Sequence, residues 1–309
     1  GRQTGHRTGR FLILGSANMD LLRQSSESLA GRITYIELPP FTLDEVTAKA
    51  SRTQDLDAQT LEALSTQLWL RGGFPDSFLA KSDQDSLILR ESFIRTYLER
   101  DVPTFGPRVP AETLRRLWTM LAHNQGQLLN ASNLAASLSV SAPTVSRYID
   151  LLVDLLLVRR LPPFFINISK RLVKSPKTYI RDSGLSHALL SIETLDELLG
   201  HPVSGLSWEG FVIENLLSMT QRASPSFYRT AAGAEVDLVL ELEGRRGTWA
   251  IEIKRTLRAK PKRGFYQALE DIQPSRAFVV HAGLDRFPLA ENIEAIGLQA
   301  MMDELKQAS

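Results

Sequence analysis

Asp237, Glu252 and Lys254 lie within one short stretch, AEVDLVLELEGRRGTWAIEIKRT. Apolar and polar side chains alternate on both sides of Gly-Arg-Arg-Gly, which predicts two β-strands joined by a tight turn. If Glu243 pairs with Thr248, then Asp237 lies opposite Lys254, and Glu252 lies diagonal to Asp237. The two acids and Lys254 then share one face of the hairpin, within the roughly 5–8 Å that separates cross-strand neighbours.

This pattern suits metal-dependent phosphodiester cleavage. Two neighbouring carboxylates can bind Mg²⁺ or Mn²⁺, which prefer oxygen ligands and activate both a phosphodiester and a water. A lysine beside them can stabilise developing negative charge. The upstream stretch WEGFVIENLL predicts a helix that offers Glu209 or Glu214 as a further acid. The alternative interpretation is a solvated polar hairpin face, because exposed strands often alternate Glu and Lys.

The elements around the hairpin predict an α/β domain. From residue 207 onward, helical patterns alternate with strand patterns at 226–230, 235–243, 248–254 and 276–281. Residues 111–158 contain three helical patterns, and the second and third are joined by a short turn as in a helix-turn-helix. We expect an apolar face on the third helix, formed by Val145, Ile149, Leu152 and Leu156. The following RRLPPFFINI predicts a strand pair or wing.

Polar and basic residues near that third helix predict a nucleic-acid surface. The segment from Leu155 to Arg181 contains seven basic residues and no acid, which is a local electrostatic footprint for DNA or RNA. Asp150 and Asp154 on the same helix would repel phosphate if they faced it. A protein-contact role for the helices, with a solvated lysine-rich loop, is the alternative. The candidate residues are Ser141, Thr144, Ser146, Arg147, Arg159, Arg160, Lys170, Arg171, Lys174, Lys177 and Arg181.

Composition limits the classes of protein to which the chain could belong. The 309 residues are enough for two or three domains, and 43% hydrophobic with 23% charged residues is ordinary for a globular protein. No apolar run approaches the ~18 residues of a membrane span, and cysteine is absent. We therefore expect a cytoplasmic protein without membrane contact. Because the net charge is only +1, nucleic-acid binding requires a local patch.

The helical acid, the Asp, the hairpin and the Glu-x-Lys together resemble the PD-(D/E)xK restriction-endonuclease-like superfamily. The resemblance implies that Asp237 and Glu252 are metal ligands and that Lys254 is the active-site lysine. It also implies a helical acid at Glu209, with Glu214 second, and a helical polar residue at Gln267. Val236 stands where the superfamily expects a proline.

A wider series of motifs resembles a family of prokaryotic AAA-type ATPases with a C-terminal domain of unknown function. The series is FLILGSA, SLAGR, LRGGFP, TYLERDV, LAASLSVSAPTVSRYIDLL, KRLVKSPKTYIRDSGL, WEGFVIEN and EVDLVLE…IEIK. The resemblance implies a multidomain α/β chain that joins an ATPase core with a helical lid, a winged helix and the nuclease-like domain. We expect the core remnant at 1–46, the lid at 47–110, the winged helix at 111–170 and the nuclease-like domain at 171–309.

The P-loop of such ATPases has no counterpart in the sequence. No Gly-x-x-x-x-Gly-Lys occurs, nor any Gly-Lys pair, and no apolar strand ends in Asp-Glu. We expect that the chain starts after these motifs and that, alone, it does not hydrolyse ATP. The resemblance then matches Ser16 or Asn18 to a sensor of the γ-phosphate. Arg32 is either an arginine finger or sensor, or a residue that stabilises a helix C-terminus.

The sequence thus predicts part of an AAA-type ATPase that associates with nucleic acid and carries a metal-dependent nuclease centre with Mg²⁺ as its cofactor. ATP would bind only to an intact family member. The rival hypothesis is a non-enzymatic DNA- or protein-binding module on a degenerate nuclease-like scaffold, and a third is a truncated, non-functional gene product. A homo-oligomer or a partner protein stays open.

Overall fold

The computed structural model describes residues 36–52, 57–104, 109–166, 172–220, 223–256 and 260–308. Its first half is helical. The elements there are α2 (Leu43–Ala50), α3 (Ala58–Arg71), α4 (Pro75–Phe78), α5 (Asp83–Thr96), a π-helical turn (Tyr97–Asp101), a 3-10 turn (Val102–Thr104), α6 (Ala111–His123), α7 (Ala131–Leu138) and α8 (Ala142–Asp154).

The second half mixes strands and helices, which confirms the expected mixed α/β architecture. In chain order the elements are β1 (Val158–Leu161), β2 (Lys177–Ile180), α9 (Ser183–Leu189), α10 (Leu195–Gly200), α11 (Ser204–Ser218), β3 (Ser224–Arg229), β4 (Glu235–Leu242), β5 (Gly247–Ile253), α12 (Arg263–Ile272), β6 (Arg276–His281), β7 (Phe287–Ala290), β8 (Ile293–Gly297) and α13 (Leu298–Ala308).

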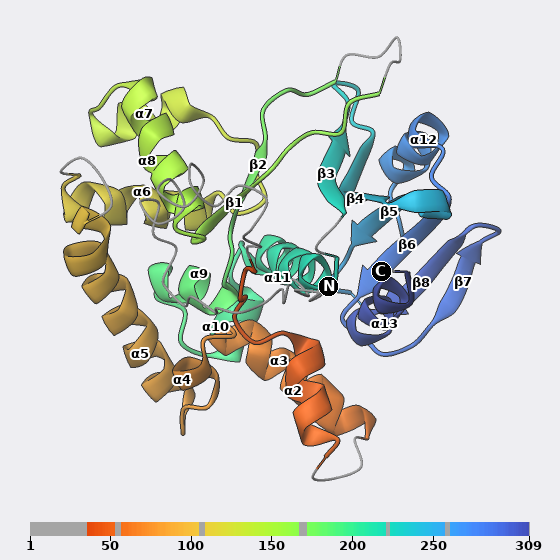
Figure 1. Cartoon of the computed structure of the whole chain (residues 1–309), viewed down its shortest axis with the longest axis horizontal. Helices are drawn as coiled ribbons and strands as arrows, with labels where there is room; N and C mark the ends of the chain where they lie inside the picture. Colours follow the sequence, from red (N-terminus) through yellow and green to blue (C-terminus); the bar gives the residue numbers. More distant parts are fainter. Residues whose placement is uncertain are drawn as a thin grey trace, which may run out of the picture.

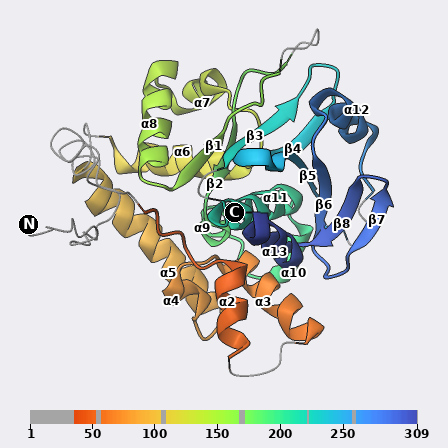
Figure 2. The same cartoon turned by 45° about the vertical axis from the view of Figure 1, so that its right-hand side comes forward.

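A six-stranded mixed sheet forms the centre of the second half, in the order β3-β4-β5-β6-β8-β7 (Figure 1). Strands β5, β6 and β8 are parallel, and the other pairs are antiparallel. Helices α11 and α13 cover one face, and α12 covers the other (Figure 2). Since both faces are covered, the inner strands β4, β5, β6 and β8 bury most of their side chains, and even the neighbours Leu238 and Val239 are both 0% exposed.

The hairpin of β4 and β5 forms as predicted, but its register differs from the expected one. Glu241 pairs with Thr248 and Leu242 pairs with Gly247, because a 3-10 turn at Gly244–Arg246 takes up the intervening residues. This shifts the pairing by two residues. A two-residue shift keeps every side chain on its face, so the predicted grouping survives. Continued one step from the pair of Leu238 and Ile251, the register places Asp237 opposite Glu252 rather than Lys254.

Helices α6, α7 and α8 pack on one another around a second core that also includes β1, β2 and α9. In α8 the predicted apolar residues Val145, Ile149 and Leu152 are all 0% exposed. The prediction for Leu156 is wrong: the helix ends at Asp154, and Leu156 adopts a left-handed conformation with φ 59° and is 40% exposed. The amphipathic face therefore lasts only as long as the helical period.

The connection from β1 to β2 joins this helical part to the sheet. The backbone N–H of Phe164 donates to the carbonyl of Phe227 at 2.6 Å, and that of Val173 donates to the carbonyl of Arg229 at 3.0 Å. These bonds cover the free edge of β3, which would otherwise expose unpaired backbone groups. The segment predicted as a wing thus pairs with the sheet edge.

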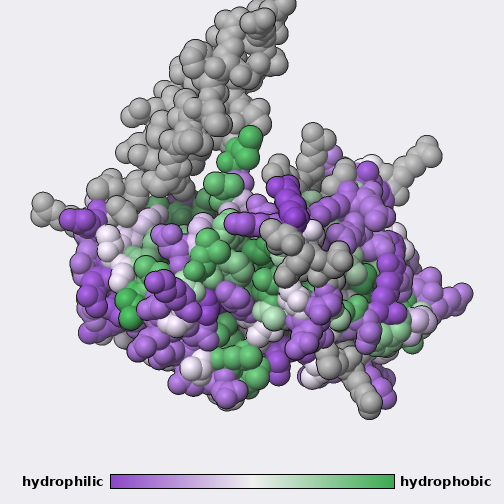
Figure 3. All heavy atoms as spheres, turned by 90° about the horizontal axis from the view of Figure 1, so that it is seen from below, coloured by the Kyte–Doolittle hydropathy of each residue, from purple (hydrophilic) through white to green (hydrophobic). Residues whose placement is uncertain are grey.

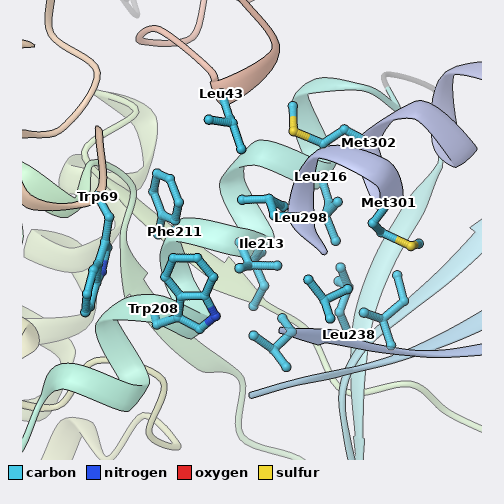
Figure 4. Close-up of a cluster of buried hydrophobic side chains, with 14 of the residues drawn as sticks. Leu43, Trp69, Trp208, Phe211, Ile213, Leu216, Leu238, Leu298, Met301 and Met302 are labelled. Atoms are coloured by element: carbon cyan, nitrogen blue, oxygen red, sulfur yellow. The ribbon is translucent and has the colours of Figure 1, made fainter. Parts of the chain in front are cut away.

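Helix α11 lies between the sheet and the helices of the first half. Figure 4 shows Trp69 of α3 beside Trp208, and Leu298, Met301 and Met302 of α13 on the other side of α11. The rings of Trp69 and Trp208 are 5.4 Å apart in an edge-to-face arrangement. One apolar core therefore joins α3, α11, α13 and the sheet.

A buried chain of hydrogen bonds runs through the same junction. Trp69 Nε1 donates to Ser207 Oγ at 3.1 Å, and Ser207 Oγ lies 2.6 Å from His187 Nε2. His187 Nδ1 lies 2.9 Å from the carbonyl of Leu70. Because a carbonyl only accepts, Nδ1 carries the proton and Nε2 accepts from the Ser207 hydroxyl. Each polar group in this chain of hydrogen bonds has a partner while His187 is neutral.

Figure 3 shows the molecule from below, with hydrophilic residues around the rim of this face and apolar residues gathered across its middle. Among the described residues, none of the helices has the length and apolar character needed to cross a membrane.

The neutral state of His187 makes stability depend on pH. Burial lowers the pKa of His187 to about 3, whereas in an unfolded chain it is about 6.5. The unfolded chain therefore binds a proton that the folded chain does not, and the free energy of unfolding falls as the pH drops below 6.5. We expect wild type to lose stability relative to His187→Asn between pH 6.5 and 5, measured by urea denaturation.

The exposed His123 provides the matched control. A His123→Asn variant should follow wild type across the same pH range. Parallel curves for wild type and His187→Asn would contradict the prediction.

Candidate active site

Three carboxylates from three elements converge at the start of β4. They belong to Glu209 of α11, Asp237 of β4 and Glu252 of β5, and these residues are 7%, 6% and 5% exposed. Glu235 lies two residues before Asp237, on the same face of β4. It completes what we call the acidic cluster: Glu209, Glu235, Asp237 and Glu252. The interpretation of a solvated hairpin face does not hold for Asp237 and Glu252, because both are buried.

Lys254 joins the cluster as the sequence predicts. Its Nζ lies 2.5 Å from Glu252 Oε1 and 3.8 Å from Asp237 Oδ2. Asp237 Oδ2 also accepts the backbone N–H of Ile253 at 2.8 Å. The ladder between β4 and β5 ends at Leu238 and Ile251, so the Asp237 carboxylate pairs a backbone group that β4 leaves free.

Lys177 is also in the cluster, which the sequence did not predict. Its Nζ lies 3.0 Å from Glu235 Oε1, 3.2 Å from Glu209 Oε1 and 3.7 Å from Asp237 Oδ1. The residue is 2% exposed, so it lies inside the protein rather than on the predicted nucleic-acid surface. Tyr179, two residues further along β2, contacts the same acid: its hydroxyl donates to Glu209 Oε1 at 2.5 Å.

The spacing of Lys177 and Tyr179 contained a usable signal. Residues two apart on a strand point to the same face, so KTYI predicts a polar pair on one side of β2. Nothing in the sequence, however, places that side against α11. A buried glutamine fixes the strand there: Gln125 Oε1 accepts the backbone N–H of Ile180 at 2.7 Å.

Crowding of the acids in the cluster shifts their pKa values. Burial and the charge of Asp237 raise the pKa of Glu252 to about 8 and that of Glu209 to about 7. Burial disfavours the charged form of Lys254, but the carboxylates of Asp237 and Glu252 outweigh burial and raise its pKa. Among the described residues, four acids meet three bases: Lys177, Lys254 and Arg229. Fully ionised, the cluster would carry one excess negative charge, and the raised pKa values of Glu252 and Glu209 mean that it takes up protons more readily than free carboxylates do.

Buried carboxylate oxygens suit Mg²⁺ or Mn²⁺ in kind. Their present arrangement does not enclose an ion, since no three His, Asp or Glu side chains within the described ranges are placed to hold a metal. The ammonium of Lys177 stands where Glu209, Glu235 and Asp237 meet. Asp237 and Glu252, with Glu209 beside them, are the residues that would hold a cation.

Glu214, the second predicted helical acid, lies elsewhere. It is five residues after Glu209, about 140° around the helix, so the two side chains face different neighbours. Glu214 pairs with Arg159, whose Nη2 donates to Oε2 at 2.8 Å, and with Arg181, whose Nε donates to Oε2 at 3.0 Å. Burial would raise the pKa of Glu214, but the two guanidiniums outweigh burial and lower it.

The last predicted catalytic residue, Gln267, is half-buried on α12. No hydrogen bond found between described residues connects it to the acidic cluster. The structure therefore brings together Asp237, Glu252, Lys254 and Glu209, but not Glu214 or Gln267.

The predicted nucleic-acid residues divide into exposed and paired groups. Ser141 caps α8 by accepting the backbone N–H of Thr144, and Arg147 is exposed on the first turns of α8 beside half-buried Ser146. Arg160 pairs with Asp150 at 2.6 Å, which neutralises one of the two acids on α8. Arg159 and Arg181 hold Glu214, whereas Lys174 is exposed.

Sequence reasoning missed two exposed arginines close to this surface. Arg115 and Arg116 of α6 line a shallow hollow of about 450 Å³ together with Ser137 and Leu138 of α7. A basic residue on an amphipathic helix is too common to indicate a site by itself, so no sequence signal distinguished these two. Five predicted residues lie outside the described part of the chain: Ser16, Asn18, Arg32, Lys170 and Arg171.

Three protein-family models match separate parts of the chain and together cover most of it. Residues 2–47 match an AAA domain, residues 62–196 a domain of unknown function (DUF8612), and residues 204–301 a domain of unknown function (DUF4143). These matches support an AAA-like, ATPase-associated family with a domain of unknown function. They indicate an ATPase-related protein of unknown function.

Uncharacterized proteins of Mycobacterium bovis and Mycobacterium tuberculosis are each 46% identical to the chain over 287 residues, covering 93% of this chain and 62% of the relative. An uncharacterized protein of Haemophilus influenzae is 26% identical over 185 residues, covering 58% of this chain and 46% of the relative. The chain thus spans less than two thirds of the length of these relatives. No solved structure matches the chain.

The pairing of Glu214 predicts a structural role that differs from that of the acidic cluster. Glu214→Gln leaves Arg159 and Arg181 without their buried counter-charge. The loss is costly because these arginine side chains are only 22% and 10% exposed. We expect a loss of about 3 kcal/mol in the free energy of unfolding, measured by urea denaturation.

Glu112→Gln is the control, because Glu112 pairs with Arg116 on the surface of α6 and its side chain is 69% exposed. This exposed pair should contribute little. Equal effects of the two substitutions would show that burial of the Glu214 pair does not contribute.

Proposed function

We propose that this chain is the nucleic-acid-associating part of an AAA-type ATPase and that Asp237, Glu252 and Lys254 form a metal-dependent nuclease centre. The observation that carries the proposal is the burial of Asp237 and Glu252 together with Lys254 at the end of one hairpin. Burying carboxylates against one another is costly, and such sites are concentrated where a cation or a reaction uses them.

Each residue has a role in this proposal. Asp237 and Glu252 hold the divalent cation on their carboxylate oxygens, and Glu209 of α11 adds a third acid. When bound, Mg²⁺ or Mn²⁺ would polarise the scissile phosphodiester and lower the pKa of a water molecule. Lys254 is 29% exposed at its side chain, so it can reach a substrate and stabilise negative charge that develops on the phosphate oxygens.

The proposed nucleic-acid surface is the start of α8. Thr144 and Arg147 lie there in contact with each other, Ser141 caps the helix, and Lys174 is exposed on the connection that leads to β2. Exposed hydroxyls, a guanidinium and a helix N-terminus all suit contacts to phosphate. ATP hydrolysis in this proposal belongs to the intact ATPase, because no Gly-x-x-x-x-Gly-Lys occurs in these 309 residues.

A second candidate is a non-enzymatic DNA- or protein-binding module built on a degenerate nuclease-like scaffold. Lys177 favours it, since an ammonium already neutralises part of the acidic cluster. The engagement of Asp237 with the backbone of Ile253 favours it too, because that bond gives the carboxylate a structural reason to be there.

Cleavage assays separate the two candidates. The purified chain is incubated with plasmid and single-stranded DNA in Mg²⁺, Mn²⁺ or EDTA. We expect metal-dependent cleavage that falls at least about 100-fold in Asp237→Asn and in Lys254→Ala, because each removes a group that acts on the reacting phosphate.

Glu214→Gln is the matched acid control, since Glu214 lies on the same helix as Glu209 but outside the cluster. Its cleavage rate should match wild type at a temperature where both are folded. No cleavage by folded wild type under any of these conditions would favour the binding-module candidate.

The nucleic-acid surface has its own prediction. Arg147→Ala should weaken binding of duplex DNA or RNA about 5-fold and reduce the salt dependence of the affinity, because one phosphate contact and its counterion release are lost. Fluorescence anisotropy at several salt concentrations measures both quantities. Arg95→Ala removes an equally exposed charge from α5 and should change neither; an identical loss in both variants would contradict a surface on α8.

A further inference from the structure

Lys177 belongs to no motif that the proposed nuclease centre uses. It comes from β2, which pairs residue for residue with β1 and belongs to the core of α6, α7 and α8. The acids around it come from α11 and β4. A residue from the helical part of the chain thus supplies a charge to the middle of a site built on the sheet.

The surroundings of Lys177 differ from those of Lys254. Lys177 Nζ faces one oxygen from each of three acids, Glu235, Glu209 and Asp237, at 3.0, 3.2 and 3.7 Å. Of the three acids, Glu235 and Glu209 lie within hydrogen-bond distance of the ammonium, and Asp237 contributes its charge from 3.7 Å. The side chain of Lys177 is 3% exposed, against 29% for Lys254.

These contacts are the ones that a cation would make. Mg²⁺ and Mn²⁺ also seek several carboxylate oxygens around one point, and burial strengthens that attraction. The point at which Glu209, Glu235 and Asp237 meet is the Nζ position itself. Two positive charges cannot share it, both because the volume is taken and because like charges repel at that separation.

We propose that the ammonium of Lys177, held by Glu209, Glu235 and Asp237, acts as a built-in competitor that denies the divalent cation the carboxylates of Glu209 and Asp237, so that metal loading requires Lys177 to withdraw. This rests on the proposed function, because it assumes that the acidic cluster binds a metal. With Lys177 in its present position, no three acids of the described residues are placed to hold an ion.

Metal binding measured without any nuclease activity tests the proposal. Mn²⁺ is titrated by calorimetry into wild type, Lys177→Met and Lys254→Met, and the melting temperature of each is recorded in EDTA and in Mn²⁺. We expect Lys177→Met to bind Mn²⁺ at least about tenfold more tightly than wild type. It should also melt lower than wild type in EDTA, where its acids are unpaired, and gain more from Mn²⁺.

Lys254→Met separates position from charge. Both substitutions remove one ammonium from contact with Asp237, but only Lys177 faces three acids at once. A similar gain in Mn²⁺ affinity in the two variants would overturn the proposal, because general charge repulsion would explain it. The double variant Lys177→Met with Asp237→Asn should lose the gain, which locates the bound ion at the cluster.

The remaining outcomes distinguish the two proposals. If wild type and Lys177→Met bind Mn²⁺ equally tightly, the competitor role is overturned and the metal centre stands. If none of the folded variants binds Mn²⁺, the metal-dependent nuclease centre fails and the competitor role fails with it. Lys177→Gln, which keeps an N–H donor for the acids, supplies the same comparison if Lys177→Met does not fold in EDTA.

Discussion

The junction between the helical part of the chain and the sheet depends on one buried ionic interaction, that of Lys177 with Glu209, Glu235 and Asp237. Taking a carboxylate or an ammonium out of water costs several kcal/mol unless each charge finds partners. Here each part supplies what the other lacks: β2 brings the ammonium, and α11 and β4 bring the carboxylates. Separating the two parts would expose uncompensated charges on both sides.

Other contacts at the junction support that interaction. The β1–β2 connection pairs with the edge of β3, which holds β2 close to the sheet. Tyr179 donates to the same oxygen of Glu209 that Lys177 contacts. On another side of α11, Arg159 and Arg181 neutralise Glu214. Both acids of this helix are therefore paired by bases from the region between α8 and α9.

The segment that matches the AAA domain ends inside this assembly. Residues 2–47 reach into α2, and the backbone N–H of Leu43 donates to Asn215 Oδ1 of α11 at 2.8 Å. Lys306 of α13 pairs with Asp44 of α2. The end of the ATPase-related segment is thus attached to the two helices that cover the sheet next to the acidic cluster.

The sequence by itself determined the local structure. Alternation placed the strands of the hairpin, and helical periodicity placed α8 with its buried Val145, Ile149 and Leu152. It also grouped Asp237, Glu252 and Lys254 on one face, and this grouping survived a register error because the error was an even number of residues. These features depend on neighbours in the chain.

Only the tertiary structure decided which distant groups meet. A helix offers acids on all sides, so the choice between Glu209 and Glu214 rested on what packs against α11. Lys177 looked like one member of a solvated basic run, because a run of charges does not reveal which member a fold will bury. The packing of β2 against α11 turned a surface candidate into a residue that is 2% exposed. Long-range pairing of charges is set by the three-dimensional path of the chain, and local sequence patterns carry no record of it.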